Sequence, residues 1–200
     1  MNLIEDKAQK EGQHEAKNNY WVKNGIKVER FPLPVGDYIV KNEKVADVIE
    51  RKSKRGVEIK KMDFLGTYDR TIDSKFSIQE LVSDICGKSH ERFRDECILA
   101  QNNGIKLIIL IENEHEVINA RKGIENSVVT SIDDLFRWKN KRAFIWRRGS
   151  QLYPKSTKGA TLAKACKTMQ EKYGVEFRFC DKRDSGRIIL ELLGVNVDGK

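Results

Sequence analysis

The sequence predicts a three-layer α/β/α fold around a central mixed sheet. Strand-like segments separated by turns fill the first 52 residues, whereas the later strand-like segments alternate with helical ones. Residues 105–111, IKLIILI, are apolar apart from Lys106, which is typical of a central strand that is buried on both faces. These observations favour an early part built from hairpins and a later part built from strands with helical crossovers.

Four strands are expected in this early part. Residues 5–19 are polar and are expected to form a loop. The dipeptide Asn24–Gly25 predicts the end of a helix. Residues 41–44 are expected to form a turn, so that the last two strands pair as a hairpin. The charged segment 53–76 predicts a long loop, of the kind that is usually functional or mobile. The expected strands are residues 2–4, 26–33, 36–40 and 45–52.

Helices dominate the rest of the chain. A capping box, in which the side chains of Ser77 and Glu80 each bond the other's backbone, marks the start of one helix. Gly174 marks the end of another. The expected helices are residues 77–85, 90–102, 131–140, 162–173 and 185–193, and the strands between them are residues 105–111 and 175–179.

The basic charge is confined to the C-terminal part of the chain. Residues 1–120 hold 20 Lys and Arg against 21 Asp and Glu, a net of −1, and residues 121–200 hold 18 against 9, a net of +9, which together give +8. Such an excess on one side indicates a polyanionic partner, with nucleic acid first. A basic protein without a polyanionic partner is the alternative.

Several protein classes are disfavoured by the sequence. No apolar stretch approaches the ~20 residues of a membrane helix, and acidic residues close behind the N-terminal apolar ones argue against a signal peptide. We therefore expect a cytoplasmic protein that does not contact a membrane. The four cysteines and three histidines are not spaced as zinc ligands, and a disulfide framework is not expected without secretion.

One group of residues has the chemistry of a metal-dependent phosphodiesterase. Asp37 begins one expected strand, and Glu50 and Lys52 share a face of the next, so a hairpin would bring the two carboxylates together. Two such carboxylates can hold Mg²⁺ or Mn²⁺, which neutralises a scissile phosphate and lowers the pKa of a bound water. A lysine beside the ion can orient that water. The competing interpretation is a surface hairpin that carries a ladder of Glu and Lys.

The surrounding string is more specific than these three residues. GDYIV, followed after a short turn by VIERKS, resembles the Gly-Asp-xn-Glu-Arg-Lys-x3-Asp signature of the XPF-type structure-specific nucleases, which belong to the PD-(D/E)xK superfamily. The resemblance covers residues 2–113, and within the family the chain resembles a phage-like or bacterial stand-alone member. It implies a restriction-endonuclease-like fold, an Mg²⁺ or Mn²⁺ cofactor and DNA as the partner, and it allows a homodimer.

The resemblance also implies roles for individual residues. The implied metal ligands are Asp37, Glu50 and Asp6, of which Asp6 matches the acid that ends the family's first strand. Lys52 matches the catalytic lysine. Arg51 matches the family arginine, although strand alternation turns it away from the metal, towards a structural role or DNA.

This chain departs from the family pattern in three places. After Asp6, Lys7–Gln9 stand where the family has Arg and Glu, so a carboxylate is missing. The family's last aspartate would align with Gly56. If residues 54–76 are an insertion, that aspartate aligns with Ser77 instead. The helix-hairpin-helix module of the family has no counterpart. The candidates to replace the missing carboxylates are Asp63, Asp69 and Asp73 in the loop, and Glu80 and Glu96 on the following helices.

Two segments are candidates for DNA contact. Arg92 and Arg94 lie at the start of an expected helix. The stretch 137–148, RWKNKRAFIWRR, has six cations and no acid, and its aromatic residues suit stacking on splayed bases, unless they belong to the core. The cations of this stretch are Arg137, Lys139, Lys141, Arg142, Arg147 and Arg148, and the two tryptophans are Trp138 and Trp146.

These features predict a single nuclease domain over residues 1–200, with a catalytic core in 1–113 and a basic part in 114–200 that completes it. The leading hypothesis is a metal-dependent DNA endonuclease that hydrolyses branched, flap or junction DNA through metal-activated water. Two alternatives stay open. One is a catalytically inactive DNA-binding module of the same fold, and the other is a junction-resolvase or restriction-type PD-(D/E)xK nuclease.

Overall fold

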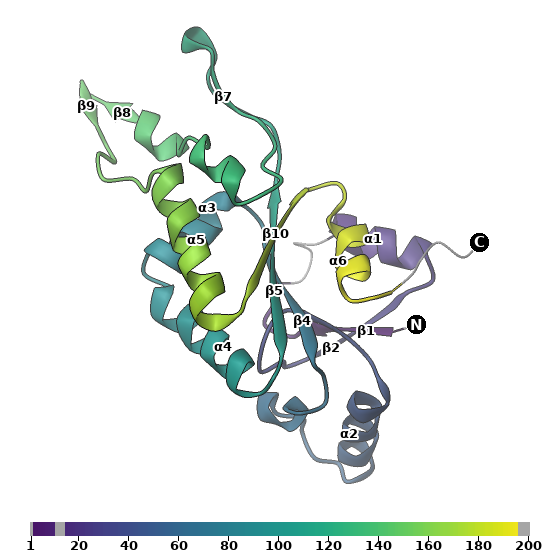
Figure 1. Ribbon diagram of the computed structural model, residues 1–200. Helices are drawn as coiled ribbons and strands as arrows, with labels where there is room; N and C mark the ends of the chain where they lie inside the picture. Colours follow the sequence, from purple (N-terminus) through teal and green to yellow (C-terminus); the bar gives the residue numbers. More distant parts are fainter. Residues whose placement is uncertain (1, 11–14, 196–200) are drawn as a thin grey trace.

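A six-stranded mixed sheet forms the centre of the protein, and a computed structural model describes residues 2–10 and 15–195 of the chain (Figure 1). The strand order is β10-β5-β4-β3-β1-β2. Strands β10, β5 and β4 are parallel, β3 is antiparallel to both of its neighbours, and β1 and β2 are parallel. The strands are β1 (Asn2–Asp6), β2 (Lys27–Phe31), β3 (Tyr38–Val40), β4 (Arg70–Lys75), β5 (Lys106–Asn113) and β10 (Glu176–Asp181).

Helices cover both faces of this sheet, so the predicted three-layer α/β/α fold is confirmed. One face carries α3 (Ile78–Cys86), α4 (His90–Asn102) and α5 (Gly159–Tyr173), and the other carries α1 (Glu15–Lys23) and α6 (Ser185–Leu192) (Figure 1). Each face has its own apolar core, because side chains alternate along a strand: Ile4 belongs to the first core and Leu3 to the second. No helix in the described ranges is long and apolar enough to cross a lipid bilayer.

The prediction of a strand over residues 45–52 is wrong, because these residues belong to the helix α2 (Glu43–Lys54). The Asn42 side chain accepts a hydrogen bond from the backbone N–H of Val45 and caps the helix. Val45 and Val48 lie three positions apart and are buried on one face, and lysines in the last turn suit the negative end of the helix dipole. The expected hairpin between residues 36–40 and 45–52 therefore does not form.

The prediction of a loop over residues 53–76 is wrong for the C-terminal part of that segment. Residues Arg70–Lys75 form β4, which lies in the middle of the sheet. The chain reaches β4 from α2 through the short 3₁₀ helix η1 (Lys61–Phe64). The early strands are not a series of hairpins either. The segment 5–19 was expected to be a loop, but α1 begins within it at Glu15 and links β1 to β2, while residues 11–14 lie outside the described part of the chain.

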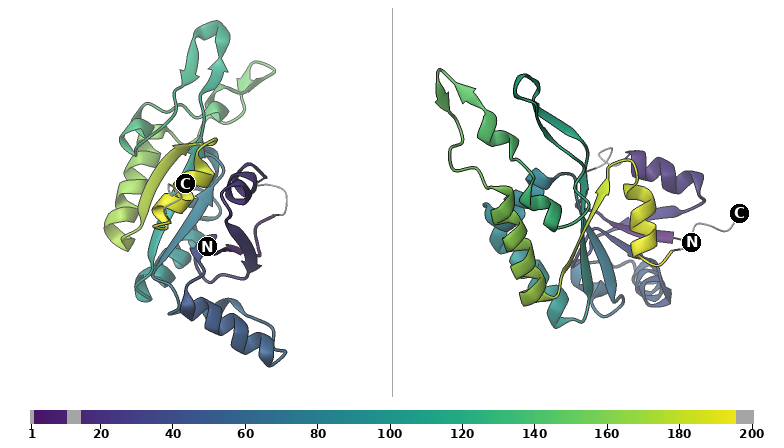
Figure 2. Two further views of the ribbon diagram at one scale, coloured as in Figure 1. Left: turned by 90° about the vertical axis from the view of Figure 1, so that its right-hand side faces the viewer. Right: turned by 45° about the horizontal axis from the view of Figure 1, so that its top comes forward.

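Two small hairpins project from the same end of the molecule, opposite α2 (Figure 2). One extends β5 and consists of β6 (Glu116–Asn119), the 3₁₀ helix η2 (Ala120–Lys122) and β7 (Ile124–Asn126). The other pairs β8 (Trp146–Arg147) with β9 (Ser150–Gln151). Between them, the helix expected over 131–140 is only one turn, η3 (Asp133–Phe136), and is followed by η4 (Lys141–Phe144).

Candidate active site

Asp37 directly precedes β3, where backbone hydrogen bonds fix it between two strands. Its N–H donates to the carbonyl of Ile72 at 2.7 Å, and its carbonyl accepts from the N–H of Asp6 at 2.7 Å. The preceding Gly36 has a φ of +72°, and a Cβ at this position would lie 2.1 Å from the hydroxyl of Thr71. Only glycine therefore fits the turn that presents the Asp37 carboxylate.

Strand β4 places Asp73 and Lys75 beside Asp37. The two side chains share one face of β4, and only 4% and 5% of these residues is exposed. The ammonium of Lys75 lies 2.8 Å from a carboxylate oxygen of Asp73 and 2.8 Å from one of Asp84, on α3. The Asp73-x-Lys75 string thus supplies a carboxylate and an amine to the same site as Asp37.

The charges in this site perturb one another. Burial and the charge of Asp73 raise the pKa of Asp37 well above its usual value, although Lys75 acts in the opposite direction. Burial alone would lower the pKa of Lys75, but Asp73 and Asp84 hold it above its usual value, so the amine is an ammonium at neutral pH. Two buried carboxylates that repel each other across a cavity provide a site for a cation.

Glu96 adds a further carboxylate from α4. Its side chain is half-buried, and one of its oxygens accepts a hydrogen bond from the N–H of Gly36 at 2.8 Å. Burial, followed by the charge of Asp73, raises the pKa of Glu96 to about 7. This carboxylate therefore changes its protonation state near neutral pH, next to the backbone that presents Asp37.

These residues line one open cavity of about 900 Å³. Asp6 is at its edge, where the carboxylate accepts a hydrogen bond from the N–H of Leu33 at 3.0 Å. The exposed guanidinium of Arg92 lies at the mouth. The acidic and basic side chains that line the cavity are Asp6, Lys10, Asp37, Lys61, Asp73, Lys75, Glu80, Arg92, Asp95 and Glu96.

A buried cation supports the site from the opposite face of the sheet. The side chain of Ser74 points away from Asp73 and Lys75, and its hydroxyl accepts from the ammonium of Lys17, on α1, at 3.2 Å. The hydroxyl and the N–H of Ser74 donate to the Asp37 carboxylate at 3.3 and 2.8 Å. Lys17 also forms a buried ion pair with Glu112 on β5. This chain of contacts fixes the orientation of the Asp37 carboxylate.

The structure separates Asp37 from the other predicted catalytic residues. Glu50 is exposed on α2 and pairs with Lys54, while Lys52 pairs with Asp63 at 2.9 Å. Arg51 is exposed on the same helix. None of the three lines the cavity that contains Asp37, because the segment is a helix and not the partner strand of β3. The prediction that Glu50 lies beside Asp37 is therefore wrong, because Asp73 on β4 occupies that position. A metal-binding role for these carboxylates stays a prediction.

The predicted DNA-contacting residues lie in two places. Arg92 is at the cavity mouth, whereas Arg94 pairs with Asp95 at 2.9 Å. The cations of segment 137–148 are all exposed, and Lys141 pairs with Glu116 at 2.8 Å. Trp138 is buried in the core, so it is not available for stacking, whereas Trp146 is exposed. DNA contact by the arginines and lysines stays a prediction.

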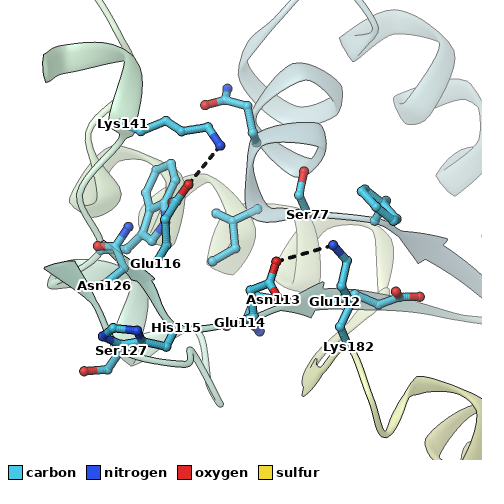
Figure 3. Close-up of a pocket in the computed structure, with 14 residues that line it drawn as sticks. Ser77, Glu112, Asn113, Glu114, His115, Glu116, Asn126, Ser127, Lys141 and Lys182 are labelled. Carbon is cyan, nitrogen blue, oxygen red and sulfur yellow. Dashed lines mark hydrogen bonds and ion pairs between the residues drawn. The ribbon is translucent and has the colours of Figure 1, made fainter. Parts of the chain in front are cut away.

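A second, smaller cavity of about 270 Å³ is drawn in Figure 3. The exposed side chain of Phe76 lines both this cavity and the first. The smaller cavity lies where the β6–β7 hairpin leaves β5 and the N-terminus of α3 begins. Its lysines are held in ion pairs, Lys141 with Glu116 and Lys182 with Glu114 at 3.5 Å. Trp138 and Lys141 of the basic segment 137–148 also line this small cavity.

The donor set of the main cavity suits a hard divalent cation. Within residues 2–10 and 15–195, no three side chains of Asp, Glu, His or Cys are grouped closely enough to hold a metal ion by themselves. Mg²⁺ is often held by one or two carboxylates, with water and substrate phosphate as the other ligands, and Mn²⁺ accepts the same donors. Asp37 and Asp73 fit this arrangement.

The sequence contained a signal for Asp73 and Lys75 that was not decisive. Asp73 was one of three open candidates in the segment 54–76, and IDSK matches the (D/E)xK pattern as well as IERK does. What the sequence could not show is which of the two strings lies on a strand next to Asp37.

Comparison with known proteins identifies the family of this chain and its fold. The ERCC4 domain model matches residues 9–192, so the chain belongs to the ERCC4 domain family. XPF from Aeropyrum pernix, solved alone and in a complex with DNA, has a similar structure, with a TM-score of 0.50 and 12% identity in both cases. The match covers 96% of this chain and 63% of that one, so this chain spans under two thirds of the solved protein. No curated protein matches the sequence significantly. The resemblance to an XPF-type nuclease domain is thereby confirmed.

Proposed function

We propose that this protein is a DNA endonuclease that depends on Mg²⁺ or Mn²⁺ and cuts branched or flap-like DNA. The observation that carries the proposal is the convergence of Asp37, Asp73 and Lys75 in one cavity of an ERCC4-family chain. The complex of Aeropyrum pernix XPF with DNA supports DNA as the substrate. We further propose that residues 1–200 act as one domain, because β10 of the basic C-terminal part pairs with β5 of the proposed core.

Each residue has a role that its surroundings suit. Asp37 and Asp73 hold the metal ion, and Ser74 and Lys17 fix the orientation of Asp37. The ion supplies neutralisation of the scissile phosphate and a bound water of lowered pKa. The ammonium of Lys75, held by Asp84, stabilises negative charge that develops on the phosphate. Arg92, at the mouth of the cavity, contacts the DNA backbone.

The test is a cleavage assay on labelled 5′-flap, splayed-arm, four-way-junction and blunt duplex DNA, with Mg²⁺, Mn²⁺ or EDTA. We expect cutting that needs a divalent ion and prefers flap or splayed-arm DNA. Asp73→Asn and Asp37→Asn should each lose at least ~10²-fold in rate, because each removes charge from the metal site. Glu50→Gln is the matched control and should keep full activity, since Glu50 lies outside the cavity.

Three results would overturn this assignment in different ways. Full activity of Asp73→Asn would exclude the site. Salt-sensitive DNA binding without any cleavage would identify an inactive binding module of the same fold. Preferential cutting of the four-way junction, or of the blunt duplex at a fixed sequence, would instead indicate a resolvase-type or restriction-type enzyme.

A further inference from the structure

The β8–β9 hairpin exposes large apolar side chains at its surface. Arg148 and Gly149 form its two-residue turn, with φ values of +50° and +78°. Trp146 is 64% exposed, and Tyr153, just beyond β9, is 45% exposed. The other two tryptophans of the chain, Trp21 and Trp138, are buried. An exposed ring of this size on a projecting hairpin indicates a binding surface.

The charge around these rings points to a polyanion. The segment 135–170 contains ten Lys and Arg and no Asp or Glu. Arg142 lies over the ring of Tyr153, with its guanidinium carbon 5.7 Å from the ring centroid. In the described part of the chain, Arg142, Arg147 and Arg148 take part in no ion pair, so their charges are free to meet phosphates. Aromatic rings between unpaired cations match the bases and phosphates of a nucleic acid strand.

The position of the hairpin relates it to the proposed active site. Lys141, one turn before the hairpin, lines the small cavity of Figure 3, and Phe76 links that cavity to the one that contains Lys75. Both projecting hairpins extend from this same end of the molecule (Figure 2). The small cavity thus has lining residues in common with the catalytic cavity, through Phe76, and with the segment that leads into the β8–β9 hairpin, through Lys141.

We infer that residues 142–153 bind the single-stranded arm of the DNA substrate. Trp146 and Tyr153 stack on unpaired bases, and Arg142, Arg147 and Arg148 contact phosphates. A single strand is the occupant rather than a duplex, because a ring can stack only on a base whose face is free. This inference rests on the proposed endonuclease function and names the part of the substrate that distinguishes a flap from a plain duplex.

The test uses the fluorescence of tryptophan in EDTA, where no cleavage takes place. Trp146 is the one exposed tryptophan of the three, so stacking on a base quenches its emission while the two buried rings keep theirs. We expect oligothymidylate to quench the emission, blunt duplex of equal length to quench it little, and Trp146→Phe to abolish the change. Trp146→Ala should weaken oligothymidylate binding by roughly 10-fold.

Phe136→Ala provides the matched control. Phe136 is also an exposed aromatic residue, but it lies on η3, outside the β8–β9 hairpin, and we expect its loss to leave single-strand binding unchanged. Equal quenching by blunt duplex, or bound oligothymidylate without quenching, would overturn the inference and leave the hairpin as a duplex or protein contact. The nuclease proposal is tested separately, by cleavage in Mg²⁺, so its failure can be distinguished from a failure of single-strand binding measured in EDTA.

Discussion

Replacement of Glu96 by Gln tests the electrostatics of the proposed site through protein stability. Gln keeps the oxygen that accepts the N–H of Gly36 at 2.8 Å but removes the charge. Burial and the charge of Asp73 raise the pKa of Glu96 from 4.5 to about 7, so the folded protein binds this proton more tightly than the unfolded chain does. Ionisation of Glu96 therefore costs free energy of folding.

The sign and size of the effect follow from proton linkage. Between pH 4.5 and about 7 the folded state binds more protons at Glu96 than the unfolded state, so the free energy of unfolding falls as pH rises through this range. At about 1.36 kcal/mol for each tenfold change in proton affinity, the move from 4.5 to about 7 corresponds to roughly 3 kcal/mol. Glu96→Gln removes this loss.

Urea unfolding in EDTA at pH 5 and pH 8 measures the effect. The variant should match the natural protein within about 1 kcal/mol at pH 5 and exceed it by roughly 3 kcal/mol at pH 8. Glu50→Gln is the control: this exposed residue pairs with Lys54 one turn away, and its loss should change stability by under ~0.5 kcal/mol at both pH values. A Glu96→Gln effect that is equal at the two pH values would refute the reasoning.

Two further predictions concern the same site. Lys75→Met should destabilise the protein by about 3–5 kcal/mol in urea unfolding, since it leaves two buried carboxylates without their cation. The control Lys54→Met, at the exposed ion pair with Glu50, should cost under ~0.5 kcal/mol. Equal losses of stability in the two variants would contradict the buried pairing. Gly36→Ala should lower the free energy of unfolding by roughly 1–3 kcal/mol more than Gly25→Ala does. Both glycines have a positive φ, but only at Gly36 would a Cβ collide with the side chain of Thr71. Equal melting temperatures for the two variants would exclude that contact.

The elements that the sequence predicted correctly are those in which local and tertiary preferences agree. Ser77 caps α3 with its side chain, as its spacing from Glu80 indicated. Residues 106–111 of the apolar run lie in β5, where both faces are covered by helices. In these segments the burial of apolar side chains and the backbone signals favour the same structure.

Strand β4 could not be predicted in this way, because its polarity serves the site. Ile72 is its one large apolar residue, and its last three side chains are Asp73, Ser74 and Lys75, all buried. Their burial is favourable only because partners on other elements, such as Asp84 and Lys17, lie within reach. These partners are distant in sequence, so no local pattern shows them.

The match of Glu50-Arg51-Lys52 to the family signature led to the wrong prediction of a strand for a related reason. Val45, Val48 and Ile49 are β-branched, which favours a strand, but they also recur at the spacing of a helix, and the Asn42 cap selects the helix. The signature arginine and lysine then fall in the last turn of α2, where cations stabilise any helix. A string of three residues therefore has two physical explanations, and only its position relative to Asp37 separates them.

The charges around β4 suit the divalent cation on which the proposed activity depends. In their ionised forms, Asp37, Asp73 and Asp84 carry three negative charges, and Lys75 carries one positive charge, which leaves −2 in a buried cluster. Burial, followed by the charge of Asp73, raises the pKa of Asp37. One Mg²⁺ or Mn²⁺ cancels the excess negative charge, so binding of the ion and ionisation of Asp37 must support each other. Metal affinity should accordingly rise with pH, and Asp37→Asn should weaken both the affinity and its dependence on pH.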